Sequence, residues 1–191
     1  MREMGEKGAE PDVVTYTTLL NFYAKSDNEQ RCAEIWDQMT EKGIEPDIVT
    51  YNTLLNFYVK CGNEQRCAEI WSEMTEKGIE PDIVTHYGLI DLKVNLSQID
   101  QAIKIYEEHH PPAIFKDEML DLHHLSHGTA VVAIIVTMRR YDRLTVICGK
   151  GLHKKNGEMY VMKNYLKEKL TNMNYEVEDG ENLGLLVIMK K

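Results

Sequence analysis

The hydrophobic and polar positions in the first part of the chain repeat with a period of 35 residues. Residues 11–45 and 46–80 align without a gap and differ at seven positions. Within each copy, apolar residues recur at three- and four-residue intervals in two stretches, which predicts two amphipathic helices per copy. One such helix pair cannot bury its apolar face alone, so the period predicts a solenoid of stacked pairs.

Residues that favour helix ends stand at the boundaries of these stretches. An acidic residue favours a helix start, an Asn side chain can cap one, and a glycine in the left-handed conformation ends one. These residues are Asp12 and Asp47 before the first helices, Asn28 and Asn63 before the second, and Gly43 and Gly78 after them.

Two further stretches keep the same register. Residues 81–117 form a degenerate third copy, and residues 1–10 match the end of a repeat, because Met4–Asp12 resembles Met39–Asp47. The chain therefore begins inside a repeat, which favours its interpretation as a fragment or a trimmed gene product.

The pattern changes after residue 111. Alternating helices and strands of this spacing predict a small two-layer α/β domain over residues 118–191. The expected helices are Thr129–Arg140 and Tyr160–Leu170, and the expected strands are Leu144–Cys148, Tyr175–Val177 and Leu183–Met189.

Composition and charge narrow the functional classes. The chain is 43% hydrophobic and 28% charged, as expected of a globular protein, and no apolar run suggests a membrane span. Residues 1–117 carry a net charge of −11 and residues 118–191 a net charge of +2. An acidic solenoid binds polyanions poorly in general, unless its acidity lies on the face away from the ligand. The four cysteines have no paired spacing and are interpreted as reduced structural thiols of an intracellular protein.

Two segments of the α/β domain could carry chemistry. If Leu120–His123 is a strand, Leu120 and Leu122 face the core, and Asp121 and His123 project together from the other side. A carboxylate beside an imidazole can orient and polarise it for proton transfer, although the same spacing more often belongs to a surface pair without a role. Small residues and lysines in the segment Cys148–Lys155 suit an anion, as a weak pattern that is not a Walker A loop. A metal site is not predicted, because the His123 and His127 spacing suits a helix and this segment reads as strand and loop.

These motifs resemble two known families. The helix opening P-D-[VI]-V-T-Y and the closing M-x-E-K-G-I-x-P-D are similar to pentatricopeptide repeats (PPR) over residues 1–117. The L-D-L-H motif at Leu120–His123, G-K-G-L-H at Gly149–His153 and the closing N-L-G-L-L-V-I resemble an Smr (small MutS-related) domain over residues 118–191. The chain thus resembles the PPR-Smr class of organelle RNA-binding proteins.

The PPR resemblance implies that each repeat reads one base of single-stranded RNA. It pairs Thr17 with Asp47 for guanine, Asn52 with Asp82 for uracil, and Tyr87 with Asp117 outside the usual pairs. An amide or hydroxyl can meet the Watson–Crick edge of an unpaired base. The resemblance further implies that Val14, Val49 and Val84 pack on base faces and that Lys25 and Lys60 face phosphates.

The Smr resemblance implies nucleic-acid binding and, in several members, RNA cleavage or DNA nicking. It assigns Asp121 and His123 to the catalytic site with Lys150 and His153, and it places Gly149 and Gly151 in the RNA-binding loop. The residues assign no cofactor, and whether a divalent ion such as Mg²⁺ is needed is left open. The alternatives are a non-catalytic adaptor for RNA or protein, and a DNA-binding or nicking domain. The resemblance also implies a chloroplast or mitochondrial location.

Overall fold

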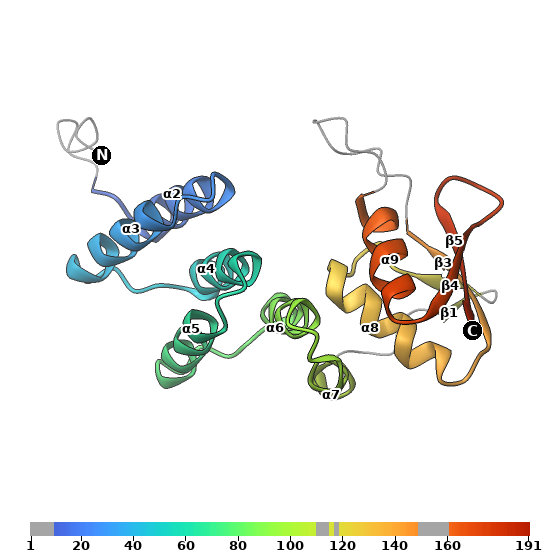
Figure 1. Cartoon of the computed structure of the whole chain (residues 1–191). Coiled ribbons are helices and arrows are strands. Elements are labelled where there is room, and N and C mark those ends of the chain that lie inside the picture. Colours follow the sequence, from blue (N-terminus) through green and yellow to red (C-terminus); the bar gives the residue numbers. More distant parts are fainter. Residues whose placement is uncertain (1–9, 110–114, 117–118, 149–160) are drawn as a thin grey trace. The chain divides into compact units, whose positions relative to one another are not determined.

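The computed structural model of the chain describes residues 10–109, 115–116, 119–148 and 161–191 (Figure 1). Its contacts divide the chain into two compact units, Met1–Gly88 and Leu89–Lys191. The boundary falls within one helix, α6. Each unit is described by itself.

The first unit consists of helix pairs. The first helices of the repeats are α2 (Val13–Lys25), α4 (Ile48–Cys61) and the start of α6 (Ile83–Asn95). The second helices are α3 (Glu29–Glu41) and α5 (Glu64–Glu76). Helix α2 packs against both α3 and α4, and α4 packs against α5, so the first two of the three predicted helix pairs are confirmed.

The core of this unit repeats with the sequence. The same repeat positions are buried in both copies. Burying a large apolar side chain contributes about 1.5–3 kcal/mol to the stability of the fold, so each repeat gains a similar stabilisation from these positions. The residues concerned, each at most 2% exposed, are Tyr16 and Tyr51, Leu20 and Leu55, Cys32 and Cys67, and Met39 and Met74.

The predicted helix caps are present. Asp12 and Asp47 cap α2 and α4, where each carboxylate accepts a hydrogen bond from the backbone N–H three residues later, at 2.9 and 2.8 Å. Asn28 and Asn63 cap α3 and α5 in the same way, each at 3.1 Å. These bonds satisfy N–H groups that have no partner within the helix.

The turn between the helices of a pair adopts a left-handed conformation at the same repeat position each time. The backbone angle φ is 51° at Asp27, 66° at Gly62 and 60° at Ser97. Glycine adopts this conformation without strain, whereas a residue with a Cβ atom pays for it.

We expect Gly62→Ala to lower the free energy of unfolding by about 1 kcal/mol, because a Cβ atom is strained at this φ. An added Cβ would meet no atom within 4 Å, so the cost would be one of backbone conformation alone. Ser97→Gly should instead raise the free energy of unfolding, because glycine adopts this φ without strain. Urea denaturation of both variants measures these effects, and a neutral Gly62→Ala would show that the turn relaxes.

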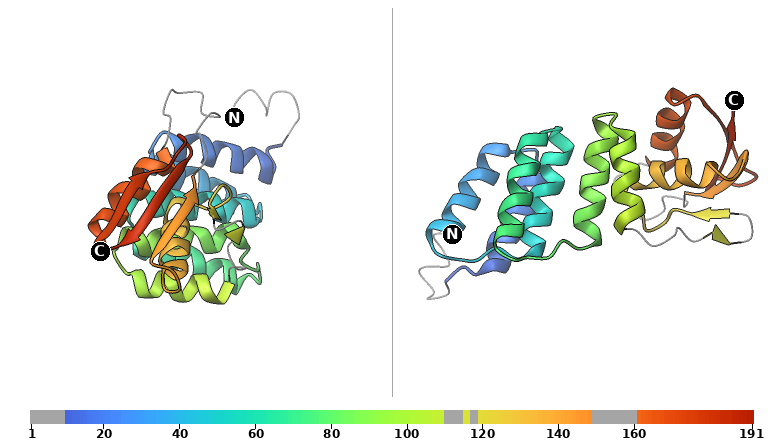
Figure 2. Two further views of the ribbon diagram at one scale, coloured as in Figure 1. Left: turned by 90° about the vertical axis from the view of Figure 1, so that its right-hand side faces the viewer. Right: turned by 90° about the horizontal axis from the view of Figure 1, so that it is seen from below.

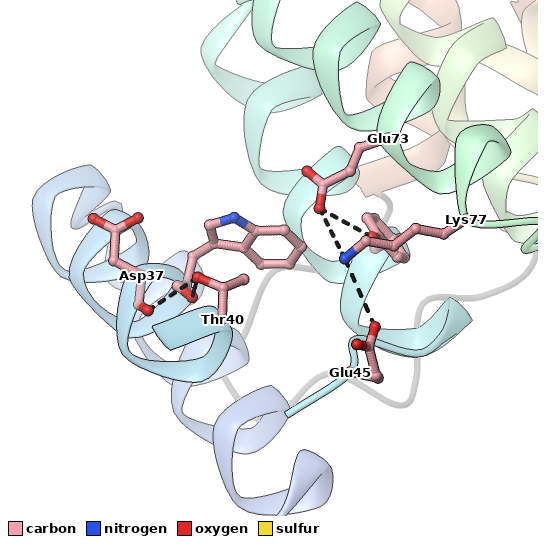
Figure 3. Close-up of polar contacts among 7 residues, drawn as sticks. Asp37, Thr40, Glu45, Glu73 and Lys77 are labelled. Atoms are coloured by element: carbon pink, nitrogen blue, oxygen red, sulfur yellow. Dashed lines mark hydrogen bonds and ion pairs between the residues drawn. The ribbon is translucent and has the colours of Figure 1, made fainter. Parts of the chain in front are cut away.

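Aromatic and charged side chains join successive repeats. The Trp36 and Tyr51 rings meet edge to face with centroids 5.6 Å apart, and the Tyr51 hydroxyl donates to Glu73 Oε1 at 3.2 Å. Lys77 Nζ lies 3.2 Å from Glu73 Oε1 and 3.8 Å from Glu45 Oε2 (Figure 3). Burial, aided by the nearby Glu73 carboxylate, raises the pKa of Tyr51. The hydroxyl therefore stays protonated and keeps donating to Glu73.

The second unit contains a five-stranded sheet with helices packed on it (Figures 1 and 2). The strand order is β1-β2-β3-β5-β4, with β2 and β3 parallel and the other pairs antiparallel. Its elements are the end of α6, α7 (Ile99–His109), β1 (Phe115–Lys116), β2 (Met119–Asp121), α8 (His127–Met138), β3 (Arg143–Ile147), α9 (Val161–Asn172), β4 (Tyr175–Asp179) and β5 (Leu185–Lys190).

Helices α6 and α7 share the hydrophobic core of the sheet. Ile90, Val94 and Tyr106 belong to the same buried cluster as Leu120 and Val146. The third helix pair therefore packs with the α/β layers. A boundary between residues 117 and 118 stays a prediction, since both lie outside the described residues.

A carboxylate from α6 caps helix α8. Asp91 Oδ1 accepts hydrogen bonds from Ser126 Oγ at 2.6 Å, Gly128 N at 2.8 Å and Thr129 N at 3.1 Å. Burial raises the pKa of Asp91, and these three bonds oppose that rise. The N-terminus of α8 is thus satisfied by a residue 35 or more positions away in the sequence.

None of the helices in the described part of the chain combines the length and the apolar character that a membrane span needs.

Candidate nucleic-acid interface

The residues of the second predicted base-reading pair contact each other at the start of the third repeat. Asn52 Nδ2 donates to Asp82 Oδ1 at 3.0 Å. Thr85 Oγ1 lies 2.8 Å from Asn52 Oδ1 and 2.9 Å from Asp82 Oδ1. Asn52 is only 8% exposed, so these bonds fix the orientation of its amide. Thr85 was missed by sequence reasoning, although its position three residues after the cap was a signal.

Burial acts to raise the pKa of Asp82, but hydrogen bonds from Thr85 and Asn52 outweigh it and hold the pKa below its usual value. The carboxylate is therefore ionised at neutral pH. Its bonds to Asn52 and to Thr85 all end on Oδ1. Among the described residues, the other oxygen takes part in none of these bonds and can accept from a ligand.

The first predicted pair is connected indirectly. Thr17 Oγ1 lies 2.7 Å from Thr50 Oγ1, which donates to Asp47 Oδ1 at 2.8 Å. Thr17 is half-buried and Asp47 is exposed. A threonine hydroxyl is shorter than an asparagine amide, so a second hydroxyl spans the remaining distance to the carboxylate.

The apolar residues predicted to pack on bases are exposed. Val14, Val49 and Val84 are 66%, 56% and 44% exposed, each at the second position of its helix. A β-branched side chain held in water at the same place in three repeats is a poor contribution to stability. Lys25 and Lys60 lie exposed in the last turns of α2 and α4.

The third predicted pair is only partly described. Tyr87 is half-buried, and burial raises its pKa. Its predicted partner Asp117 lies outside the described residues. The pairing of Tyr87 with Asp117 therefore stays a prediction.

Asp121 and His123 are brought together, as predicted. His123 Nδ1 lies 2.6 Å from Asp121 Oδ1, and the His123 backbone N–H donates to the same oxygen at 2.9 Å. Leu120 and Leu122 are buried at 0% and 1% exposure. Strand β2 ends at Asp121, so the contact is made by a turn in which the carboxylate bonds the backbone two residues on.

The electrostatics of this pair favour an ionised carboxylate. Partial burial acts to raise the pKa of Asp121, but hydrogen bonds from His123 and the nearby His123 and His124 rings outweigh it, so the pKa is lower than usual. Both side chains of the pair remain nearly half-exposed. The carboxylate holds the imidazole at Nδ1, and solvent or a ligand can still reach the rest of the ring.

Two of the sequence motifs, L-D-L-H and the closing N-L-G segment, meet at the ends of neighbouring strands. Asp121 pairs with Ile147, and Leu122 N donates to Ile147 O at 3.1 Å. Cys148 N donates to Gly184 O at 2.9 Å, which brings the closing N-L-G segment to the same edge. The carboxyl ends of parallel strands are where ligands bind in open α/β sheets. The loop residues Gly149, Lys150, Gly151 and His153 lie outside the described residues.

The remaining histidines of this region are placed separately. His124 is exposed beside the pair, and the His127 ring packs against Tyr165 with centroids 5.1 Å apart. Within the ranges that the structure describes, no three His, Cys, Asp or Glu side chains gather closely enough to hold a metal ion.

The stacked helix pairs, with a hydrogen-bonded polar row where the first helices begin, define a helical-repeat protein. More particularly, the chain belongs to the pentatricopeptide repeat family, whose domain model matches residues 1–61 and 34–96.

Solved structures with the same fold include PPR10 from maize, at 20% identity and a TM-score of 0.57, covering 90% of this chain and 24% of PPR10. PPR10 in complex with an 18-nt psaJ RNA element is 24% identical, with a TM-score of 0.55, and covers 86% of this chain and 22% of PPR10. The PPR domain of Arabidopsis thaliana protein-only RNase P 1 in complex with tRNA is 16% identical, with a TM-score of 0.50, and covers 73% of this chain and 66% of that domain. The chain thus spans about a quarter of the length of PPR10. No curated protein matches the chain.

Proposed function

We propose that the chain binds single-stranded RNA and that each helix pair selects a base. The observation that carries this proposal is the hydrogen-bonded Asn52–Asp82 pair beside an exposed valine, Val84. An oriented amide and an ionised carboxylate offer both a donor and an acceptor to the edge of an unpaired base. RNA complexes of PPR10 and of the RNase P repeat domain support this class of ligand.

Preorganisation favours this function. The Asn52 amide is held by Thr85 and Asp82 before any ligand arrives, so binding costs little further side-chain entropy. The exposed Val49 and Val84 flank the amide along the chain and offer apolar contact to base faces. Lys25 and Lys60 supply isolated positive charges for phosphates on an otherwise acidic unit.

The chain contains its own matched test of base selection. Repeats one and two carry Thr17 and Asn52 at the same position, each with an aspartate partner. We expect Thr17→Asn to shift the preference of its repeat from guanine toward uracil, and Asn52→Thr to shift the other toward guanine. Each good contact is worth on the order of 1–3 kcal/mol.

Competition binding with RNAs that differ only at the two corresponding bases measures both shifts. The double swap is the control, because it should exchange the two preferences while keeping total affinity. If either single swap left the base order unchanged in a chain that still bound RNA, the assignment of this repeat position would be wrong.

We further propose that residues 118–191 form an Smr domain that cleaves RNA beside the bound repeats. The observation in support is the 2.6 Å contact between Asp121 and His123 at the sheet edge where Cys148 and Gly184 also lie. In this mechanism Asp121 holds His123 through Nδ1, and the opposite ring nitrogen either takes the proton of the hydroxyl or water that attacks phosphorus or gives a proton to the oxygen that leaves as the P–O bond breaks. Lys150 and His153 of the glycine-lysine loop would support the developing charge.

Other assignments of this domain are distinguished by the same assay. A non-catalytic adaptor would bind RNA or protein and leave RNA intact, whereas a DNA-directed domain would nick or bind DNA instead. Cleavage assays with and without EDTA test whether a divalent ion such as Mg²⁺ takes part. An organelle location stays a prediction.

A further inference from the structure

A cleft of about 470 Å³ opens between α9 and the turn that joins β4 to β5. Figure 1 shows α9 and this hairpin within the C-terminal α/β layers. The cleft is lined by Lys163, Asn164 and Lys167 from α9 and by the segment 179–183. The closing N-L-G motif contributes Asn182 and Leu183 to the lining, whereas Lys163, Lys167 and Asp179 belong to no motif identified in the sequence.

At its centre, one carboxylate is held by two ammonium groups. Lys163 Nζ lies 2.7 Å from Asp179 Oδ1, and Lys167 Nζ lies 2.7 Å from Asp179 Oδ2. Lys163 also donates to Leu183 O at 3.2 Å. Its side chain is 8% exposed and is fixed in place, whereas Lys167 and Asp179 are 36% and 60% exposed and can be reached by a ligand.

This geometry matches that of a bound phosphate. One ammonium on each carboxylate oxygen is the arrangement that two non-bridging phosphate oxygens would adopt. The hydrogen bonds from Lys163 and Lys167 lower the pKa of Asp179 to about 2, so protonation does not release the lysines at physiological pH. A phosphate that binds to these lysines must therefore displace the Asp179 carboxylate.

The charges of the cleft explain why such replacement would be selective. Lys163 and Lys167 are balanced by Asp179 and Glu181, so the lining is formally neutral while Asp179 stays in place. The amides of Asn164 and Asn182 add uncharged donors. A strand with several linked phosphates can displace a carboxylate here when its neighbouring nucleotides are held elsewhere.

The cleft and the Asp121–His123 pair lie at the same ends of the strands of the sheet. The strand registers connect Asp121 to Ile147, Ile147 to Leu185, and Leu186 to Asp179. Strand β4 is three strand positions from β2, which corresponds to about 14 Å along the edge. A few nucleotides of single-stranded RNA can span this separation.

We propose that this cleft is a subsite for a backbone phosphate of single-stranded RNA, in which the phosphate takes Lys167 from Asp179 while Lys163 stays in place. The inference rests on the proposed function, since it requires that the chain binds RNA. It adds a contact for the strand beside the Asp121–His123 pair.

The first test removes the exposed lysine. The full chain is titrated with labelled single-stranded RNA carrying the two predicted bases, over a series of salt concentrations. Lys167→Gln is expected to weaken binding about three- to tenfold and to reduce the salt slope by about one. Lys169→Gln is the matched control, because it removes the same charge from α9 outside the cleft, where Lys169 lies 5.8 Å from the Tyr165 ring centroid. It should change neither value appreciably.

The second test has the opposite sign. Asp179→Asn removes the competing carboxylate and is expected to tighten RNA binding, although it breaks two ion pairs of the native fold. Asp142→Asn is its control, since Asp142 pairs with Lys190 at the opposite edge of the sheet. Thermal unfolding of every variant shows which of them are folded. If Asp179→Asn does not fold, the comparison of Lys167→Gln with Lys169→Gln tests the subsite by itself.

The outcomes separate the two proposals. A wild-type chain that binds no RNA would overturn the proposed function and the subsite together. A wild-type chain that binds RNA, with Lys167→Gln and Lys169→Gln equally affected, would overturn the subsite alone. Weaker binding by Lys167→Gln only, with tighter binding by folded Asp179→Asn, would support it.

Discussion

His123→Ala is expected to reduce RNA cleavage by at least about 100-fold while leaving RNA binding nearly intact. The reason is that His123 is the imidazole held by Asp121 at 2.6 Å and remains open to a ligand on its other side. His123 is paired with the Asp121 carboxylate and adds little net charge to attract phosphate, so affinity should not follow activity. Single-turnover cleavage and fluorescence anisotropy measure the two properties separately.

His124→Ala is the matched control for this prediction. His124 is the adjacent exposed histidine, and it should retain most of the activity because the Asp121 contact belongs to His123. Asp121→Asn should also impair cleavage, since it alters the group that orients the ring. Equal cleavage by wild type and His123→Ala, after removal of contaminating nucleases, would exclude the catalytic role and favour the adaptor. Parallel assays with DNA distinguish the nicking alternative.

Gly128→Ala is expected to destabilise the second unit by about 3 kcal/mol, although alanine normally stabilises a helix by up to about 1 kcal/mol relative to glycine. A Cβ atom at Gly128 would lie 2.6 Å from Asp91 Oδ1 and 2.8 Å from Asp91 Cα. The second atom is backbone and cannot turn away. Helices α6 and α8 would have to separate, with loss of the hydrogen bonds to Asp91.

The sign of this effect makes the prediction sharp. Thr137→Ala on the same helix serves as the control, because it is only half-buried and its hydroxyl bonds within the helix. Urea denaturation gives the free energy of unfolding of each variant. If Gly128→Ala were neutral or stabilising, the close packing of α6 on α8 would be wrong, and helix propensity alone would account for the position.

The sequence predicted the repeats well because each local signal agreed with the next. Apolar spacing, the aspartate and asparagine caps and the glycine after each second helix are short-range features that act within one helix pair. They are confirmed in α2 to α5, where the same residues recur in the same roles.

The packing of the third helix pair could not be predicted in the same way. Ile90 and Val94 are apolar in every copy, as Leu55 and Val59 show, so their burial against an α/β layer left no mark in the pattern. The one signal was Asp91, which replaces the exposed asparagine of the earlier copies. Strand β1 was not predicted because two residues are too few for a period.

The candidate site was predicted in part for the right reason. Strand alternation correctly put Leu120 and Leu122 in the core, but Asp121 meets His123 through a turn beyond the strand. The ion pairs of Lys163 and Lys167 with Asp179 join residues of α9 and β4 that belong to no sequence motif, and only the tertiary fold brings them together.

Under the proposed base readout, the aspartates at the repeat boundaries would restrict which RNA sequences such a chain can come to recognise. Asp82 accepts a bond from Asn52 of the preceding repeat, and it also receives the backbone N–H of Thr85 at the start of α6. Replacing a helix-capping side chain with an alanine costs about 1 kcal/mol. The residue at the position of Asn52 can therefore vary freely during evolution. The residue at the position of Asp82 must be one of the few that also cap a helix.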